Sequence, residues 1–152
     1  MRINLIYFGK ASQFAAQEEL KYIKRIKAWT SLSVIELKPS KSKDSLVGLR
    51  EEMKQYLGKY PEIPLIVMAE EGTVLSSLGI SEKMVKWSEN GLSVVNFLVG
   101  SSYGIHPDLK SLAHFVWSLT PLTLTHDHAR IILCEQVYRA LCIQKNHPYH
   151  HV

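Results

Sequence analysis

A glycine-rich stretch at residues 100–104 is the first candidate for a ligand site. It reads Gly-Ser-Ser-Tyr-Gly and directly follows the apolar run 94–99, which predicts a buried strand. In parallel sheets, ligands bind beyond the carboxyl ends of the strands, where backbone N–H groups can face them. The stretch lacks the full dinucleotide-binding fingerprint and the lysine of a phosphate-binding loop. It is therefore either a ligand-binding loop or a tight turn that uses glycine for positive φ.

The segment 119–124, Leu-Thr-Pro-Leu-Thr-Leu, is unusually apolar and hydroxyl-rich for a connection between a strand and a helix. If such a loop is buried, its backbone polar groups need partners. A planar heterocycle such as adenine, held between apolar side chains and hydrogen-bonded by the main chain, would provide them. The alternative is a loop that packs against another subunit.

The C-terminal residues have charged and aromatic side chains suited to chemistry on a nucleic acid. Arg139 follows Glu135 by four residues, so it forms a helix ion pair or contacts a phosphate or a base. In the tail, Tyr149 could stack on a base and His150 could hydrogen-bond to it. The tail histidines have no carboxylate or cysteine nearby to complete a metal site, so we expect no metal.

Strands alternate with helices, which predicts an α/β fold with a mostly parallel sheet and helices on both faces. The expected strands are the apolar runs 3–8, 33–37, 65–69, 94–99 and 115–119. Helices are expected after Ser12, after Asp44 or Ser45, over 81–87 and over 126–145. In the first helix, Ala16, Leu20 and Ile23 are expected to face the core. No repeat divides the chain, so we expect residues 1–152 to form a single domain.

The last helix carries two apolar stripes instead of the single stripe that a surface helix needs. The stripes are Leu133-Val137-Leu141 and Cys134-Tyr138-Cys142. This pattern predicts that the helix packs on the core and also on a partner chain.

The charge balance is mildly basic, with 18 Lys and Arg against 14 Asp and Glu, a net charge of +4. This excess is compatible with a nucleic-acid partner and also common among enzymes that have none. Lysines and one arginine gather at 21–27, where the expected helix ends and a solvated face is the simple interpretation. The segment 39–43, Pro-Ser-Lys-Ser-Lys, breaks all periodicity and is either an RNA contact or a linker.

The two cysteines, Cys134 and Cys142, lie eight residues apart in one expected helix, roughly 12 Å between backbones, too far for a disulfide. We expect two free thiols, which suit a reducing cytoplasm. The apolar N-terminus is too short for a signal peptide, and no run reaches the ~20 apolar residues of a membrane span. The expected location is therefore cytoplasmic, without a membrane partner.

Taken in order, these segments resemble a known family. They are the run Phe-Leu-Val-Gly-Ser-Ser-Tyr-Gly-Ile at 97–105, Trp-Ser-Leu-Thr-Pro-Leu-Thr-Leu-Thr-His at 117–126, Arg130, Glu-Gln-Val-Tyr-Arg-Ala at 135–140 and Asn-His-Pro-Tyr-His at 146–150. The chain resembles the ribosomal large subunit methyltransferase H family, part of the trefoil-knotted (SPOUT) methyltransferase superfamily. The likeness covers nearly the whole chain. The Tyr-Arg-Ala helix together with the Pro-Tyr-His terminus is its specific part.

The resemblance implies a homodimer with a deep C-terminal trefoil knot and S-adenosylmethionine as methyl donor. It implies methylation of N3 of a pseudouridine in 23S rRNA within the ribosome, with no DNA substrate. The donor would be bound by Met68, Gly100, Leu119, Thr120, Pro121, Leu122, Thr123 and Leu124. Arg139, Tyr149 and His150 would lie at the target nucleotide, and the tail would reach the partner's site across the dimer.

The chain departs from the family's usual pattern at a few pocket positions. Family members usually have glycine where Ser101 stands, a polar or acidic residue at Tyr103, proline at Thr125 and often an acid at Ala69. If position 101 required positive φ, serine would cost on the order of 1 kcal/mol. A donor bound by backbone groups would tolerate these changes of side chain.

The implied chemistry needs little beyond positioning, because the sulfonium donor is already electrophilic. As a hypothesis, Arg139 stabilises the anion that develops when the pseudouridine N3–H is lost, and His150 accepts or relays that proton. Two other functions compete with this one. They are a non-catalytic ribosome-binding or RNA-binding module with the same fold, and an unknotted nucleotide-dependent α/β enzyme.

Overall fold

The computed structural model describes residues 1–151 and contains a five-stranded sheet in which every pairing is parallel. The strand order is β2-β1-β4-β3-β5. The strands are β1 (Arg2–Phe8), β2 (Leu32–Leu37), β3 (Leu65–Val74), β4 (Val94–Val99) and β5 (Phe115–Ser118). The helices are α1 (Gln13–Lys27), α2 (Ser45–Lys59), α3 (Ser77–Glu89), α4 (Pro107–Leu112) and α5 (His126–Gln144). The predicted α/β fold with a parallel sheet is confirmed.

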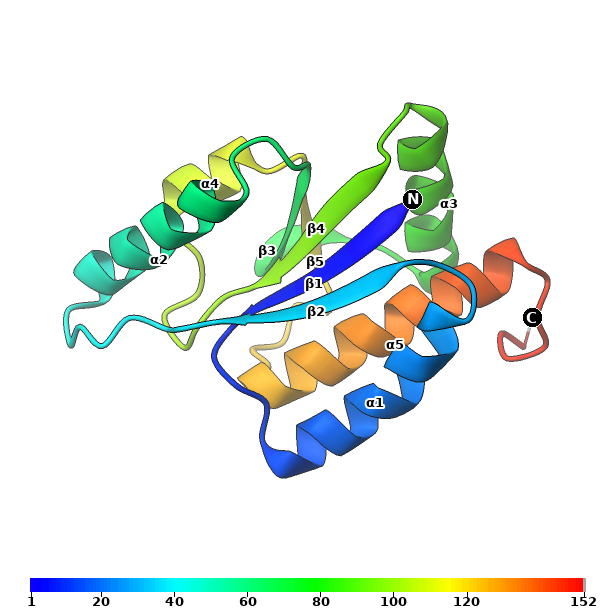
Figure 1. Ribbon diagram of the computed structural model, residues 1–152, viewed down its shortest axis with the longest axis horizontal. Helices are drawn as coiled ribbons and strands as arrows, with labels where there is room; N and C mark the ends of the chain where they lie inside the picture. The colour runs from blue at the N-terminus through cyan, green and yellow to red at the C-terminus, as the bar shows by residue number, and fades with distance from the viewer. Residues whose placement is uncertain (152) are drawn as a thin grey trace.

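Helices cover both faces of the sheet (Figure 1). On one face, α1, α3 and α5 close the larger core, to which α3 contributes Ile80, Met84 and Trp87. On the other face, α2 and α4 close a smaller core through Tyr56 and Leu109. Strands covered on both faces are mostly apolar along their length, which explains the largely apolar sequences of β1 and β4.

The polar exception within the sheet is a pair of asparagines on neighbouring strands. The Asn4 amide donates to the Asn96 carbonyl oxygen at 2.8 Å, and the Asn96 amide donates to the Tyr56 hydroxyl at 2.9 Å. Because burying an amide without partners is costly, these bonds account for Asn96 in the middle of β4.

The helices begin at side chains that accept hydrogen bonds from their first turns. Ser12 accepts from the Ala15 N–H at the start of α1, and Asp44 accepts from the Val47 N–H at the start of α2. Ser12 was expected as a cap, and Asp44 was one of two candidates, the other being Ser45. A helix loses about 1 kcal/mol when such a cap is removed.

Two elements are longer than the sequence indicates, and one was not expected. α3 begins at Ser77 instead of 81, and β3 continues through Glu70 and Glu71 to Val74, with a break in its register against β5. The short helix α4 begins with Pro107, which suits the first turn of a helix because it has no N–H to lose. Six residues are too few to show a helical period, so the pattern could not reveal it.

The inward face of α1 differs from the prediction. Ala16 and Leu20 are exposed, Leu20 by 47%, whereas Ala15, Glu19 and Ile26 are buried. The prediction was wrong for Ala16 and Leu20, because Glu19 is drawn into the core by an arginine of α5. It is confirmed for Ile23, which is partly buried and packs against the larger core.

Both stripes of α5 are buried within the same chain. Leu133, Val137, Cys134 and Cys142 are fully buried, and α5 packs against both α1 and α3. The second stripe is thus explained without a partner chain, so this pattern no longer argues for one. Both cysteines are free and buried, as expected.

Candidate functional site

A pocket of about 780 Å³ lies at the carboxyl ends of β3, β4 and β5. We call it the strand-end pocket. Its lining comes from the end of β3, the turn after β4, the connection between β5 and α5, and the first turn of α5. The lining residues are 68–71, 99–105, Lys110, Leu119, Thr120, 122–126 and Ala129. A stretch of β3 and two loops that are far apart in sequence therefore meet at one site.

Seven of the eight residues expected to bind the donor line this pocket. They are Met68, Gly100, Leu119, Thr120, Leu122, Thr123 and Leu124. Pro121 is exposed and is not among the lining residues. The assignment of these residues to a ligand remains a prediction, but the structure brings them together around one hollow.

The glycine-rich stretch is a tight turn that also forms a wall of the pocket. The Gly104 N–H donates to the Ser101 carbonyl at 2.9 Å, and Gly104 has a φ of +84°. A Cβ on Gly100 would lie 2.2 Å from the Gly104 carbonyl oxygen, so this position has no room for a side chain. Among residues 1–151, Asn146 is the one non-glycine residue with positive φ, so Ser101 is not strained.

The connection between β5 and α5 is more exposed than a buried loop would be. Leu122 is 71% exposed, and its N–H donates to the Thr120 hydroxyl at 3.3 Å. The Thr123 hydroxyl donates to Glu70 Oε2 at 2.7 Å and so ties this connection to the end of β3. The segment therefore forms an open side of the pocket.

Charged residues at the pocket were not singled out from the sequence. Glu70 and Glu71 continue β3 beyond its apolar part, and Lys110 of α4 forms an ion pair with Glu71. The hydrogen bond from Lys110 lowers the pKa of Glu71, which keeps this carboxylate ionised. The position of both acids directly after the apolar run of β3 was the available signal, since strand ends in parallel sheets face ligands.

His126 lies where α5 begins and lines the same pocket. Its Nε2 is buried and has no hydrogen-bond partner among the described residues. Burial, followed by the nearby charge of Arg130, lowers the pKa of His126 from its ordinary value of 6.5. The imidazole is therefore held neutral at physiological pH.

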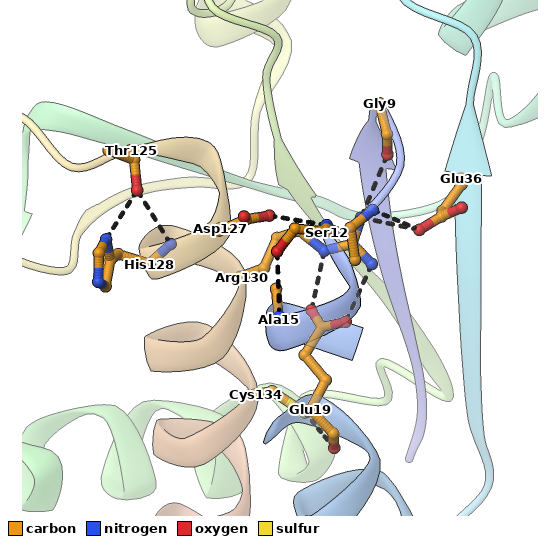
Figure 2. A network of polar contacts seen from close by, with 11 residues as sticks. Gly9, Ser12, Ala15, Glu19, Glu36, Thr125, Asp127, His128, Arg130 and Cys134 are labelled. Carbon is orange, nitrogen blue, oxygen red and sulfur yellow. Dashed lines mark hydrogen bonds and ion pairs between the residues drawn. The ribbon is translucent and has the colours of Figure 1, made fainter. Parts of the chain in front are cut away.

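Below the pocket, Arg130 of α5 joins α1, β2 and the end of β1 (Figure 2). Its guanidinium donates to both carboxylate oxygens of Glu19, at 2.9 and 3.0 Å, and to the Gly9 carbonyl at 3.1 Å. It also pairs with Glu36 at 2.9 Å and lies 3.8 Å from the centre of the Tyr7 ring. Arg130 is 1% exposed, so this network fixes the start of α5 against the sheet instead of contacting a ligand.

Two of the three residues expected at the target nucleotide meet at the far end of α5. Arg139 donates to Glu135 Oε1 from Nε at 2.9 Å and from Nη2 at 2.6 Å. The Tyr149 hydroxyl donates to the same oxygen at 3.0 Å, and the Arg139 guanidinium lies 4.7 Å from the Tyr149 ring centre. We call Glu135, Arg139 and Tyr149 the C-terminal cluster. His150 is half-buried just beyond it, and its Nδ1 has no partner among the described residues.

The C-terminal cluster does not reach the strand-end pocket of its own chain. Ala129 lines the pocket, and Arg139 follows it by ten residues on the same helix. At 1.5 Å per residue this separation is about 15 Å. The structure thus divides the expected residues into two groups at opposite ends of α5.

Comparison with known families identifies the class of protein that this fold and pocket define. A family model described as "Predicted SPOUT methyltransferase" matches residues 1–150. The chain belongs to the SPOUT methyltransferase family and is an enzyme of that class.

Curated relatives narrow the membership further. A protein of Gloeobacter violaceus is 34% identical, and one of Methylobacillus flagellatus is 32% identical, each over 99% of both chains. Both carry the name ribosomal RNA large subunit methyltransferase H. The resemblance noted in the sequence is thereby confirmed at the level of this particular family.

Solved structures agree on the fold. A probable methylase family protein from Haemophilus influenzae aligns with a TM-score of 0.56 at 13% identity, covering 95% of this chain and 66% of that one. A probable methyltransferase from Bordetella pertussis aligns with a TM-score of 0.51 at 12% identity, covering 92% and 96%. At these identities the likeness concerns the fold alone.

Within residues 1–151, no group of three or more His, Cys, Asp or Glu side chains could hold a metal ion. In the same part of the chain, no helix combines the length and apolar character needed to cross a bilayer.

Proposed function

We propose that this enzyme transfers a methyl group from S-adenosylmethionine to N3 of a pseudouridine in 23S rRNA within the ribosome. The observation that carries the proposal is the strand-end pocket, which gathers Met68, the Gly100 turn and the 119–124 connection in a member of this family. The names of the relatives support rRNA as the substrate.

The chemistry of the pocket fits such a donor. Gly100 leaves backbone groups uncovered by any side chain, so main-chain atoms can approach a bound adenosyl group closely. Glu70, which has no ion-pair partner among the described residues, places negative charge at a pocket that would receive a cationic sulfonium and an ammonium group, whereas Lys110 neutralises Glu71. The bound donor supplies an electrophilic methyl group, and the chain's task is to align the acceptor nitrogen with it.

The acceptor nitrogen must lose its proton before it can accept the methyl group. Arg139 would stabilise the resulting negative charge, and the His150 imidazole would accept or relay the proton. Tyr149 would stack against the target base. Without RNA its ring contacts Arg139 and Tyr138, and its hydroxyl donates to Glu135. To take up this role, Arg139 would exchange part of its bonding with Glu135 for contact with the nucleotide.

Because the two groups of residues are about 15 Å apart along α5, one chain does not bring them to a common substrate. We propose a homodimer in which each C-terminal tail reaches the strand-end pocket of the other copy. The family membership also supports a deep C-terminal trefoil knot around the donor, a single domain over residues 1–152 and a cytoplasmic location.

The direct test is transfer of labelled methyl from S-adenosylmethionine to ribosomes that lack the modification, followed by nucleoside mapping. Label in N3-methylpseudouridine of 23S rRNA is the expected result. Label elsewhere would refute the substrate assignment, and absence of donor binding heat in calorimetry would favour the non-catalytic RNA-binding module instead.

Arg139 is tested by the same assay. Arg139→Ala should lower turnover by about 10²-fold or more while donor affinity stays within a factor of two, since the arginine acts on the acceptor. Unchanged turnover would remove Arg139 from the mechanism.

A further inference from the structure

A buried carboxylate connects the strand-end pocket to a lysine-rich surface segment. Glu52 of α2 is 4% exposed. Its Oε2 accepts from the Ser101 hydroxyl at 2.9 Å, and its Oε1 accepts from the Ser40 N–H at 2.9 Å. Ser101 belongs to the turn that lines the pocket, and Ser40 belongs to residues 38–43, which we call the basic segment. The Glu52 side chain therefore connects the pocket turn to the basic segment through one hydrogen bond to each.

A second connection runs through Tyr103, another residue that departs from the family's usual pattern. The Tyr103 hydroxyl donates to the Ser42 carbonyl at 3.2 Å, and Tyr103 also lines the pocket. Its ring packs on Gly48, where a Cβ would lie 3.3 Å from Tyr103 Cδ2. The departures at 101 and 103 thus share one consequence, which is to attach the basic segment to the pocket.

The basic segment has a fixed backbone and free charges. The Ser42 N–H donates to the Ser40 hydroxyl at 3.0 Å, and the Asp44 N–H donates to the Ser42 hydroxyl at 3.1 Å. The lysines of the segment, Lys38, Lys41 and Lys43, are exposed, and the described residues provide none of them with an ion-pair partner. Cations on an ordered loop bind an anion at a smaller entropy cost than cations on a flexible one.

We infer that the basic segment binds phosphate groups of the rRNA substrate and that Glu52 positions it relative to the strand-end pocket. The inference rests on the proposed function for the identity of the RNA. Phosphate contacts carry no sequence information, but they fix the register of a protein on a nucleic acid. Held by Glu52 beside the pocket turn, the segment would set how far the RNA backbone lies from the transferred methyl group.

Removal of the charges gives a quantitative test. Each phosphate contact contributes about 0.7–0.9 to the slope of log affinity against log salt, so Lys41→Ala/Lys43→Ala should lower that slope by roughly 1.4–1.8. Between about 50 and 200 mM salt, the wild type should lose about tenfold more affinity than the variant. Equilibrium binding to ribosomes lacking the modification measures this, with calorimetry to verify that S-adenosylmethionine affinity is unchanged.

A matched pair of lysines provides the control. Lys24→Ala/Lys27→Ala removes the same charge from the exposed end of α1, where neither lysine forms an ion pair with another described residue. It should leave the salt slope within about 0.5 of the wild type. Equal slopes for the two double variants, or a larger effect of the α1 pair, would overturn the inference.

The positioning role of Glu52 has its own variants. Glu52→Gln keeps both connections, since its amide oxygen can accept from Ser40 and its NH₂ can donate to the Ser101 hydroxyl. Glu52→Ala breaks both. We expect Glu52→Ala to raise the KM for ribosomes by about tenfold at unchanged kcat. We expect Glu52→Gln to have a KM close to that of the wild type. A KM unaffected by Glu52→Ala, or a fall in kcat alone, would reject the role.

These measurements separate the inference from the proposed function. If the wild type binds ribosomes but methylates no pseudouridine, the proposed reaction fails, and the salt slopes still decide the role of the basic segment. If methylation occurs and the lysine variants match the wild type, the proposed reaction stands and the inference fails.

Discussion

Replacing Gly100 by alanine is expected to damage the strand-end pocket through backbone displacement. The new Cβ would lie 2.2 Å from the Gly104 carbonyl oxygen and 2.7 Å from its carbon. Both contacts are to main chain, so no side-chain rotation can relieve them. The turn closed by the Gly104 N–H and the Ser101 carbonyl can escape these contacts only by opening, and that turn is a wall of the pocket.

The magnitude follows from the two interactions affected. Overpacking of a close-packed site costs about 1–3 kcal/mol, and loss of the turn's hydrogen bond costs about 1 kcal/mol. These two costs are alternatives. A turn that stays closed keeps the overpacked contacts and lowers the free energy of unfolding by about 1–3 kcal/mol. A turn that opens loses only its hydrogen bond, but it must close again to bind the donor, which weakens donor binding by up to roughly 30-fold.

Urea denaturation and calorimetry with S-adenosylmethionine together measure both losses. Gly58→Ala is the control, because a Cβ there meets nothing within 4 Å and the residue lies in α2. Alanine at position 58 should stabilise the helix by up to about 1 kcal/mol and leave donor affinity unchanged. If Gly100→Ala matched the wild type in both measurements, the close approach of the two glycines would not shape the pocket.

Three further predictions concern the core beneath the pocket. Arg130→Met should lower the free energy of unfolding by about 3–5 kcal/mol in urea denaturation, because it leaves Glu19 buried without a counter-charge; a loss below 1 kcal/mol would contradict this. Burial lowers the pKa of His126 in the fold, so the unfolded chain binds its proton more readily and stability should fall as pH drops below 6.5. His126→Phe should weaken that dependence, and an identical pH profile would exclude His126 as a cause. Burial raises the pKa of Cys134 to about 12, so thiol reagents should label Cys134 only at the rate of unfolding; rapid labelling of the native protein would refute its burial.

The sequence predicts the architecture well because the responsible signals are local. The apolar run of β4 and the caps Ser12 and Asp44 each lie within a few residues of the element they specify. A ligand site at the strand ends also follows from such signals, since each expected loop adjoins a predicted strand.

What the sequence could not predict depends on contacts between distant residues. Glu19 is buried because Arg130 neutralises it across 111 positions, and the buried face of α1 is thereby shifted away from Ala16 and Leu20. The roles of Ser101 and Tyr103 likewise depend on α2, which no pattern near residue 100 indicates.

The pairing of Arg130 with Glu19 has a consequence for synthesis of the chain. Translation produces Glu19 early, and its counter-charge arises more than a hundred residues later. During that interval the nascent chain carries α1 without the helix that covers it, so the larger core cannot close until α5 has left the ribosomal exit tunnel. Shortened polypeptides that end before residue 126 should therefore expose an apolar surface and become targets of chaperones and proteases.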